Sequence, residues 1–250
     1  MPRPNRYAQP GHMYHVISRF PGHFLSEQDL IDGREHKTKL CDHSCGIFEA
    51  ALRKNKKKFG FGLICCVLMS THYHLIIAIP PTDQEGTISR ILHGLHSDFA
   101  HWYNRFKGRI GQVIVDRPST PVVEDSAHLL NAIRYIHRNP TASSLEVEPE
   151  DWKYSTHRAH ATRGKEGWLA DLIDYDPSKF GILGFEHLTA NKLFKILKKS
   201  CRKAVKNLGL WWRKVRCAQV IGSTGFRAQI RQEMGLSQIK MGPWVLVPGN

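Results

Sequence analysis

Two histidines stand two positions apart in the stretch "LMSTHYHLIIAIP", which runs from Leu68 to Pro80. The apolar residues that follow them are typical of a buried β-strand. Side chains two positions apart on a strand share a face, so His72 and His74 point the same way and Tyr73 points the other. Two imidazoles within reach of each other readily hold one divalent metal ion. The same pattern also fits ordinary histidines on the wet face of a sheet, and the pair alone leaves both interpretations open.

A second set of reactive side chains lies downstream in "RYIHRNP". Tyr135 and Asn139 are four apart and therefore share one face of a helix, whereas His137 points off that face. The amide oxygen of Asn139 is a good neutral ligand for Mg²⁺ or Mn²⁺. The phenolic oxygen of Tyr135 could attack a phosphodiester, although a half-buried structural tyrosine would look the same in sequence. A nucleophilic tyrosine beside a metal held by His72, His74 and Asn139 would form one coherent strand-cleaving site.

The overall charge points to a polyanionic partner. The chain has 250 residues, a formal net charge of +14 and a pI near 9.7, which favours nucleic acid, although an unrelated basic enzyme could share it. No apolar run is long enough to cross a membrane, and the first residues, "MPRPNRYAQPGHMYH", lack the apolar core of a secretory signal. We therefore expect a cytoplasmic, nucleoid-associated protein without a membrane partner.

The six cysteines are expected to be reduced thiols in such a compartment. Cys65 and Cys66 lie inside an apolar strand and look like small core residues. Cys41 and Cys45 lie near two histidines but lack a second ligand pair at standard spacing, which argues against a zinc cluster.

Hydrophobic periodicity predicts the elements that must position these residues. Strands are predicted at 12–20, on both sides of a turn at 69–71, and at 110–116; helices are predicted from Ser26 to Lys58 with a break near Gly33, at 87–107 and at 124–140. This order predicts the α+β class, with a ferredoxin-like antiparallel sheet and helices packed on one face.

The composition changes at about residue 166, and residues 166–250 are predicted to form a basic, mainly helical extension. Residues 195–216 hold nine Lys or Arg and no acid, a density that suits contact with a phosphate backbone. Trp211 and Trp212 could stack on unpaired bases, but large aromatics more often pack in a core. The residues predicted to contact DNA are Arg19, Arg105, Arg117, Arg138, Lys198, Lys199, Arg202, Lys203, Arg213 and Lys214.

Taken together, these motifs resemble the single-tyrosine transposases of the HUH endonuclease superfamily, in particular the REP-associated tyrosine transposases. The matching pieces are "MYHVISR", "LMSTHYHLIIAIP", "AHWYNRF", "RYIHRNP" and "PEDWKYST", in the family's usual order across residues 8–165. The H-x-H triplet alone is a weak signal, and Y-I-H-x-N-P at the right distance downstream makes the combination strong.

The resemblance implies a domain at residues 8–165 in which His72, His74 and Asn139 bind Mg²⁺ or Mn²⁺ and Tyr135 is the nucleophile. Members of this branch cleave single-stranded DNA near hairpin-forming repeats, form a 5′-phosphotyrosine link and reverse the step for strand transfer. The resemblance favours a monomer, with a homodimer as the alternative. Thr71 departs from the family, which usually has Asn before the first histidine, and "SRFPG" replaces the usual "SRG".

Two other functions remain compatible with the sequence. One is a domesticated protein that binds DNA hairpins without cutting them, against which the intact set of Tyr135 and the two histidines argues. The other is an RNA-binding or RNA-cleaving ferredoxin-like protein, which would also be basic.

Overall fold

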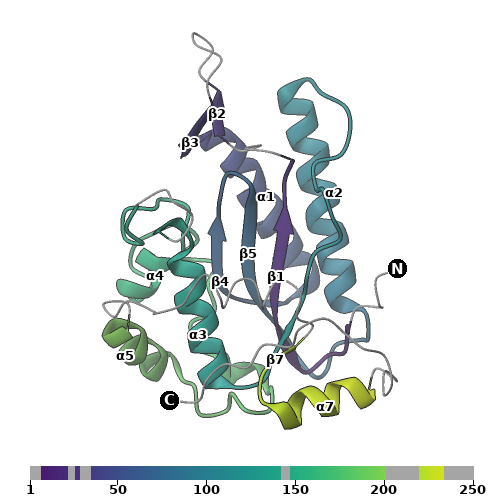
Figure 1. Ribbon diagram of the computed structural model, residues 1–250, viewed down its shortest axis with the longest axis vertical. Coiled ribbons are helices and arrows are strands. Elements are labelled where there is room, and N and C mark those ends of the chain that lie inside the picture. Colours follow the sequence, from purple (N-terminus) through teal and green to yellow (C-terminus); the bar gives the residue numbers. More distant parts are fainter. Residues whose placement is uncertain (1–6, 22–25, 29–34, 142–146, 201–219, 234–250) are drawn as a thin grey trace.

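The computed structural model describes residues 7–21, 26–28, 35–141, 147–200 and 220–233. Its centre is an antiparallel sheet of β1 (His12–Arg19), β4 (Gly62–Leu68), β5 (His72–Ile79) and β6 (Val122–Val123), in the order β4-β5-β1-β6. Figure 1 shows β4, β5 and β1 side by side in this order. The short strand β7 (Val220–Ile221) adds to this sheet, parallel to β6. The α+β class and the ferredoxin-like strand order are confirmed.

Helices cover both faces of the sheet, whereas the sequence analysis placed them on one face. The helices α1 (Asp42–Phe59) and α2 (Thr87–Lys107) meet the face that carries Tyr73, whose ring lies 5.0 Å from that of Phe48 in α1. The helix α3 (Ser126–His137) packs on the opposite face, where the ring of Tyr135 lies 5.5 Å from that of His74. The predicted division of the strand into a histidine face and a Tyr73 face is therefore seen, but the histidine face is covered by α3 rather than open to water.

The prediction of a helix from Ser26 is wrong. The strands β2 (Ser26–Gln28) and β3 (Glu35–Leu40) form a separate antiparallel pair, and the first helix begins only at Asp42. The segment before Cys41 lacks apolar residues at helical spacing, so a helix there would have no stripe to bury. From Asp42 on, α1 buries such a stripe and ends at Gly60, whose φ of 67° is a left-handed cap.

The prediction of a strand at 110–116 is also wrong. The chain does run beside β1 here, because Val115 N donates to Arg19 O and Ser119 N donates to Ile17 O. Among the described residues between α2 and α3, however, only Val122–Val123 pair regularly enough to form a strand, β6. Pro118 and Pro121 have no N–H to donate, so they interrupt the pairing before it reaches Val122.

The C-terminal extension packs on this core. Its described elements are η2 (Pro177–Phe180), α5 (Ala190–Ser200), β7 and α7 (Thr224–Glu233), and α4 (His157–Ala161) precedes it. Asp174 N donates to Leu63 O at 2.7 Å, and Ile173 and Phe185 belong to the same hydrophobic cluster as the strands. The boundary between residues 8–165 and 166–250 stays a prediction.

Two further sequence expectations concern the described residues. Cys41, Cys45, Cys65 and Cys66 are free thiols, as expected. None of the described helices is both long enough and apolar enough to cross a membrane.

Candidate metal and tyrosine site

The structure brings the two histidines of β5 together with Asn139, which follows the end of α3. His72 Nε2 donates to Asn139 Oδ1 at 3.0 Å, and Asn139 Nδ2 donates to His74 Nε2 at 3.1 Å. The rings of His72 and His74 lie 5.1 Å apart and nearly perpendicular. Both Nε2 atoms therefore converge on one carboxamide.

The helix α3 positions Tyr135 and Asn139 over this pair. It begins at Asp125, whose carboxylate accepts from His128 N at 2.9 Å, and it buries Leu129, Ile133 and Ile136 against the sheet. The ring of Tyr135 packs edge-on against His74, and the tyrosine is only 4% exposed. The four residues predicted from sequence to form one site thus lie in one cluster, in which His72 is half-buried and the other three are buried.

Burial keeps the site uncharged near neutral pH. It lowers the pKa of His72 to about 4, an effect opposed by the bond to Asn139 and increased by the Arg19 cation, and it lowers the pKa of His74 well below the usual value. Burial also raises the pKa of Tyr135, opposed by a hydrogen bond with Asn139. Both histidines are therefore in the neutral form that binds metal, and the phenol keeps its proton.

This donor set fits a divalent metal ion. His72 Nε2 lies 3.0 Å from Asn139 Oδ1, and His74 Nε2 lies 3.1 Å from Nδ2 of the same carboxamide, so two imidazole nitrogens and one amide oxygen gather around one side chain. Nitrogen-rich sets of this kind favour Mn²⁺ over Mg²⁺, because Mg²⁺ prefers oxygen ligands.

His15 also belongs to this cluster, and the sequence analysis missed it. Its Nε2 lies 2.9 Å from His74 Nδ1, and both residues are fully buried. The β1–β5 register pairs His15 with Ile76, two residues from His74 on the same face. The alternation of "HMYHVISR" places His15 on one face of its strand, but only the register between two distant strands shows which histidine it meets.

The basic residues predicted to contact DNA are only partly described. Arg19 lies opposite His72 in the β1–β5 register and is exposed; Arg105 and Arg117 are exposed, and Arg138 is half-buried. Lys198 and Lys199 lie near the end of α5. The remaining predicted contacts lie outside the described residues, as do the two tryptophans: Arg202, Lys203, Trp211, Trp212, Arg213 and Lys214. Their contact with DNA stays a prediction.

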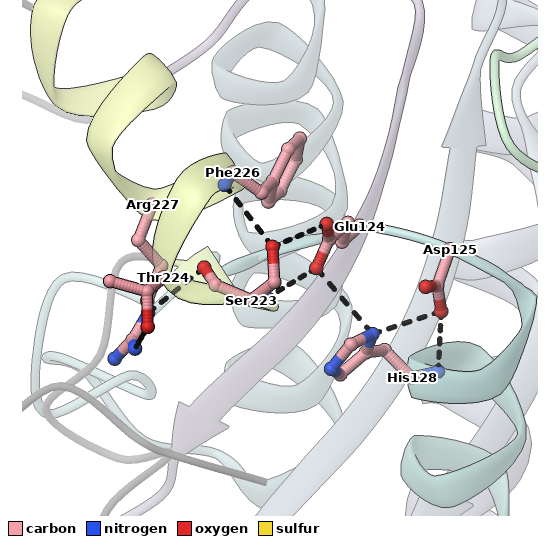
Figure 2. Close-up of polar contacts among 7 residues, drawn as sticks. All are labelled: Glu124, Asp125, His128, Ser223, Thr224, Phe226 and Arg227. Atoms are coloured by element: carbon pink, nitrogen blue, oxygen red, sulfur yellow. Dashed lines mark hydrogen bonds and ion pairs between the residues drawn. The ribbon is translucent and has the colours of Figure 1, made fainter. Parts of the chain in front are cut away.

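A second polar cluster lies where α3 begins (Figure 2). His128 Nδ1 is 2.9 Å from Asp125 Oδ1 and 3.7 Å from Glu124 Oε2, and these three residues are the only group of three or more His, Cys, Asp or Glu in the described chain whose ligand atoms lie within 4.8 Å. Glu124 also accepts from the backbone N–H and, at 2.7 Å, the hydroxyl of Ser223, directly before α7. Through these contacts the cluster holds the start of α7 next to the start of α3.

Comparison with known proteins bears on the fold. No protein-family model matches the sequence, and no curated protein does. The structure of a REP-associated tyrosine transposase bound to a REP hairpin matches 70% of this chain and 94% of that chain, with a TM-score of 0.52 and 18% identity. This chain has the fold of that transposase. A "putative transposase" from Deinococcus radiodurans matches 56% of this chain and 95% of its own, at 18% identity, but its TM-score of 0.34 carries no argument. The resemblance read from the sequence motifs is thus confirmed for the fold.

Proposed function

We propose that this protein is a metal-dependent single-stranded DNA endonuclease and strand transferase, a transposase that acts at hairpin-forming repeats through a covalent 5′-phosphotyrosine. The observation that carries the proposal is the convergence of His72, His74, Asn139 and Tyr135 in one cluster. The fold supports it, because the transposase that shares this fold is bound to a REP hairpin. The formal net charge of +14 suits such a partner.

Each residue has a distinct role in the proposed reaction. His72, His74 and Asn139 hold Mn²⁺ or Mg²⁺, which supplies a Lewis acid for the scissile phosphate when it is bound. Tyr135 Oη attacks the phosphorus and loses its proton to solvent. The bond from phosphorus to the 3′ oxygen breaks, and that oxygen takes its electron pair and one proton to become a free 3′-hydroxyl. Attack by a 3′-hydroxyl on the phosphotyrosine reverses the step, so rejoining needs no ATP.

The burial of Tyr135 adds a requirement. A side chain that is 4% exposed is not reached by a phosphate as it stands, so DNA binding must uncover the phenol. In the proposed function DNA binding therefore includes a local rearrangement around Tyr135. We propose a monomer as the working unit, with a homodimer as the alternative, and the cytoplasm as its compartment.

A covalent-adduct assay tests the proposal. The full chain is incubated with a labelled single-stranded hairpin from repeats near its own gene and with Mn²⁺ or Mg²⁺, and the products are run on a denaturing gel. We expect a metal-dependent shifted protein band that Tyr135→Phe and His74→Ala both lose. Tyr175→Phe is the matched control, because Tyr175 Oη donates to Ala170 O outside the site.

The other outcomes separate the alternatives. Hairpin binding without an adduct would indicate a protein that recognises repeats without cutting them. RNA cleavage through a 2′-hydroxyl would survive Tyr135→Phe, because that reaction needs no tyrosine nucleophile.

A further inference from the structure

The function proposed above makes no use of His15, although this histidine touches one of the proposed metal ligands. His15 Nε2 and His74 Nδ1 lie 2.9 Å apart, with the ring centroids 5.1 Å apart. The two residues come from β1 and β5, neighbouring strands paired over eight residues, so the contact is held by rigid elements. Both side chains are fully buried, which favours the neutral form of each ring.

The hydrogen bonds of Asn139 determine where the proton of His74 lies. An amide nitrogen can only donate, so the contact between Asn139 Nδ2 and His74 Nε2 requires a lone pair on Nε2. A neutral imidazole then carries its single proton on Nδ1, and His74 donates it to His15 Nε2. His74 Nε2, the atom that accepts from Asn139, is thereby kept unprotonated, which is the form that a metal ligand needs.

We propose that His15 is a positioning residue that fixes the tautomer and the ring orientation of His74 for metal binding. The inference rests on the metal site of the proposed function. Outer partners of this kind commonly change metal affinity by about 10- to 100-fold. Thr71 Oγ1 lies 2.9 Å from Nδ1 of the other histidine, His72, and donates to it, because His72 carries its proton on Nε2. The ring of Tyr135 lies 6.2 Å from that of His15, so the same imidazole also borders the proposed nucleophile.

Calorimetric titration of the full chain with Mn²⁺, without DNA, tests the role of His15. We expect His15→Leu to weaken Mn²⁺ binding by about 10- to 100-fold and His15→Gln to restore much of it, because the glutamine oxygen can accept the same hydrogen bond. His12 lies on the same strand but contacts Tyr7 at 2.9 Å, so His12→Leu should bind Mn²⁺ like the wild type. A His15→Leu protein with unchanged affinity would overturn the inference, and so would a His15→Gln protein as weak as His15→Leu.

A measurement on the wild type does not depend on the variants folding. The ¹⁵N chemical shifts of His74 in the metal-free protein should show a protonated Nδ1 and an unprotonated Nε2; the reverse assignment would overturn the inference. A wild type that bound no Mn²⁺ at all would contradict the metal site of the proposed function. A wild type that bound Mn²⁺ as tightly as His15→Leu would contradict only the role of His15.

A separate observation concerns the turn between α2 and β6. Four large apolar side chains are exposed in the described chain, and three of them, Phe106 (42%), Ile110 (98%) and Val115 (45%), lie at the end of α2 and in the segment that follows it; residues 105–117 are called the turn below. The same stretch of sequence contains a single acid, Asp116, and four cations, Arg105, Lys107, Arg109 and Arg117. An apolar surface with this charge fits nucleic acid better than a neutral protein surface.

The turn is anchored at the end of the sheet where the candidate site lies. Val115 N donates to Arg19 O at 3.0 Å, and Arg19 pairs with His72 in the β1–β5 register. The ring of Phe106 stacks on His43 of α1 with centroids 4.0 Å apart, which holds it in place. A DNA strand that leaves the site at His72 would meet the turn next.

We infer that this turn receives the unpaired bases beside a DNA hairpin, with the apolar side chains against the bases and the cations near the phosphates. This inference also rests on the proposed function. Its test is the affinity of the full chain for a labelled hairpin with a single-stranded flank and for the same hairpin without one, measured by fluorescence anisotropy. We expect Ile110→Ser to weaken binding of the flanked hairpin by about fivefold or more and to leave the blunt hairpin unchanged.

Leu183→Ser is the matched control, because Leu183 is the fourth exposed apolar residue, at 85%, and lies in the extension. Equal binding of the flanked hairpin by Ile110→Ser and the wild type would overturn the inference, as would equal losses for both hairpins. A wild type that bound neither hairpin would instead contradict the proposed function.

Discussion

At the scale of single residues, the ligands proposed for the candidate site are all neutral. Asn139 accepts from His72 with Oδ1 and donates to His74 with Nδ2, so both of its amide groups are used. A carboxylate at this position could still accept from His72, but it would place an oxygen lone pair against that of His74 Nε2. The amide thus satisfies the metal-free cluster in a way that the more usual acidic ligand would not.

Replacing this amide by a carboxylate should therefore move two properties in opposite directions. We expect Asn139→Asp to lower the melting temperature of the metal-free protein and to raise its affinity for Mn²⁺ by about tenfold or more, because a negative ligand replaces a neutral one. Thermal unfolding with and without Mn²⁺ measures both effects. Asn139→Ala is the control, since it removes both hydrogen bonds and supplies no charge, and a variant that lost stability without gaining affinity would argue against Asn139 as a ligand.

At the scale of elements, the sequence predicted those whose own side chains specify them. The strand at His72–Ile79, the helix at Thr87–Lys107 and the helix that carries Tyr135 all show clear periodicity, and the structure contains them. The predicted site residues meet because these elements meet.

The elements that were mispredicted depend on distant partners. The sequence of the β2–β3 pair shows little alternation of apolar and polar residues. The strand that pairs with β1 is only Val122–Val123 long, because the prolines before it cannot donate a backbone hydrogen bond to the neighbouring strand. His15 was missed for the same reason, since its role follows from a register between strands separated by 59 positions. The roles of the other site residues remain a proposal, because proximity in the fold does not by itself establish chemistry.

The packing of α1 on α2 gives a prediction at the same scale, based on two helical glycines. Gly94 of α2 faces Asn55 of α1, and an added methyl group would overlap the Asn55 carboxamide, which bonds to Ala51 O and Asp98 Oδ2 at 2.9 Å each. Gly46 of α1 has no atom within 4 Å of an added methyl group. Alanine favours a helix interior over glycine by about 1 kcal/mol, so the surroundings decide the sign.

We expect Gly46→Ala to raise the free energy of unfolding by about 0.5–1 kcal/mol and Gly94→Ala to lower it by about 1–3 kcal/mol. Urea titration followed by circular dichroism measures both. The two variants share the same chemical change, so effects of the same sign would show that the close approach of α1 and α2 is not as described.

At the scale of the whole molecule, buried histidines make the fold sensitive to acid. Burial lowers the pKa values of seven described histidines: His12, His15, His72, His74, His137, His157 and His160. Because their pKa is lowered, these histidines bind protons in the unfolded chain at pH values where they stay neutral in the folded chain. Their contribution to the free energy of unfolding is therefore fully present above pH 6.5, the pKa of histidine in the unfolded chain, and is lost as the pH falls below it. The lowered aspartate pKa values affect stability only below the ordinary aspartate value of 3.8.

His160 provides a test outside the candidate site. Burial lowers its pKa to about 4, and its Nδ1 donates to Thr156 O at 2.9 Å. Its ring lies 5.1 Å from that of His137, which in turn contacts Cys65 and His157. Between pH 6.5 and 4 this residue alone removes up to about 3 kcal/mol of stability. We expect His160→Gln to flatten the decline in unfolding free energy over this range, measured by urea titration at several pH values, and a slope equal to that of the wild type would contradict a neutral buried His160.

The net charge of +14 should make the affinity for DNA depend on salt concentration, and exposed arginines near the site should contribute to that dependence. Arg19 is exposed and lies opposite His72, and it lowers the pKa of that histidine, so its positive field reaches the candidate site. Arg158 is also exposed, but its guanidinium donates to Glu166 Oε2 at 2.8 Å and its charge is already balanced. If DNA passes over the site, the first arginine contacts a phosphate and the second does not.

Hairpin affinity measured at several salt concentrations distinguishes the two arginines. Each phosphate contact adds about one unit to the slope of log affinity against log salt, because binding releases the counterions of that phosphate. We expect Arg19→Gln to weaken binding and to reduce the slope by about one, and Arg158→Gln to change neither. If Arg19→Gln and the wild type gave equal slopes of log affinity against log salt, the DNA path would lie elsewhere on the molecule. A DNA strand that crosses the site passes next to the cation beside His72, so Arg19 would then contact a phosphate.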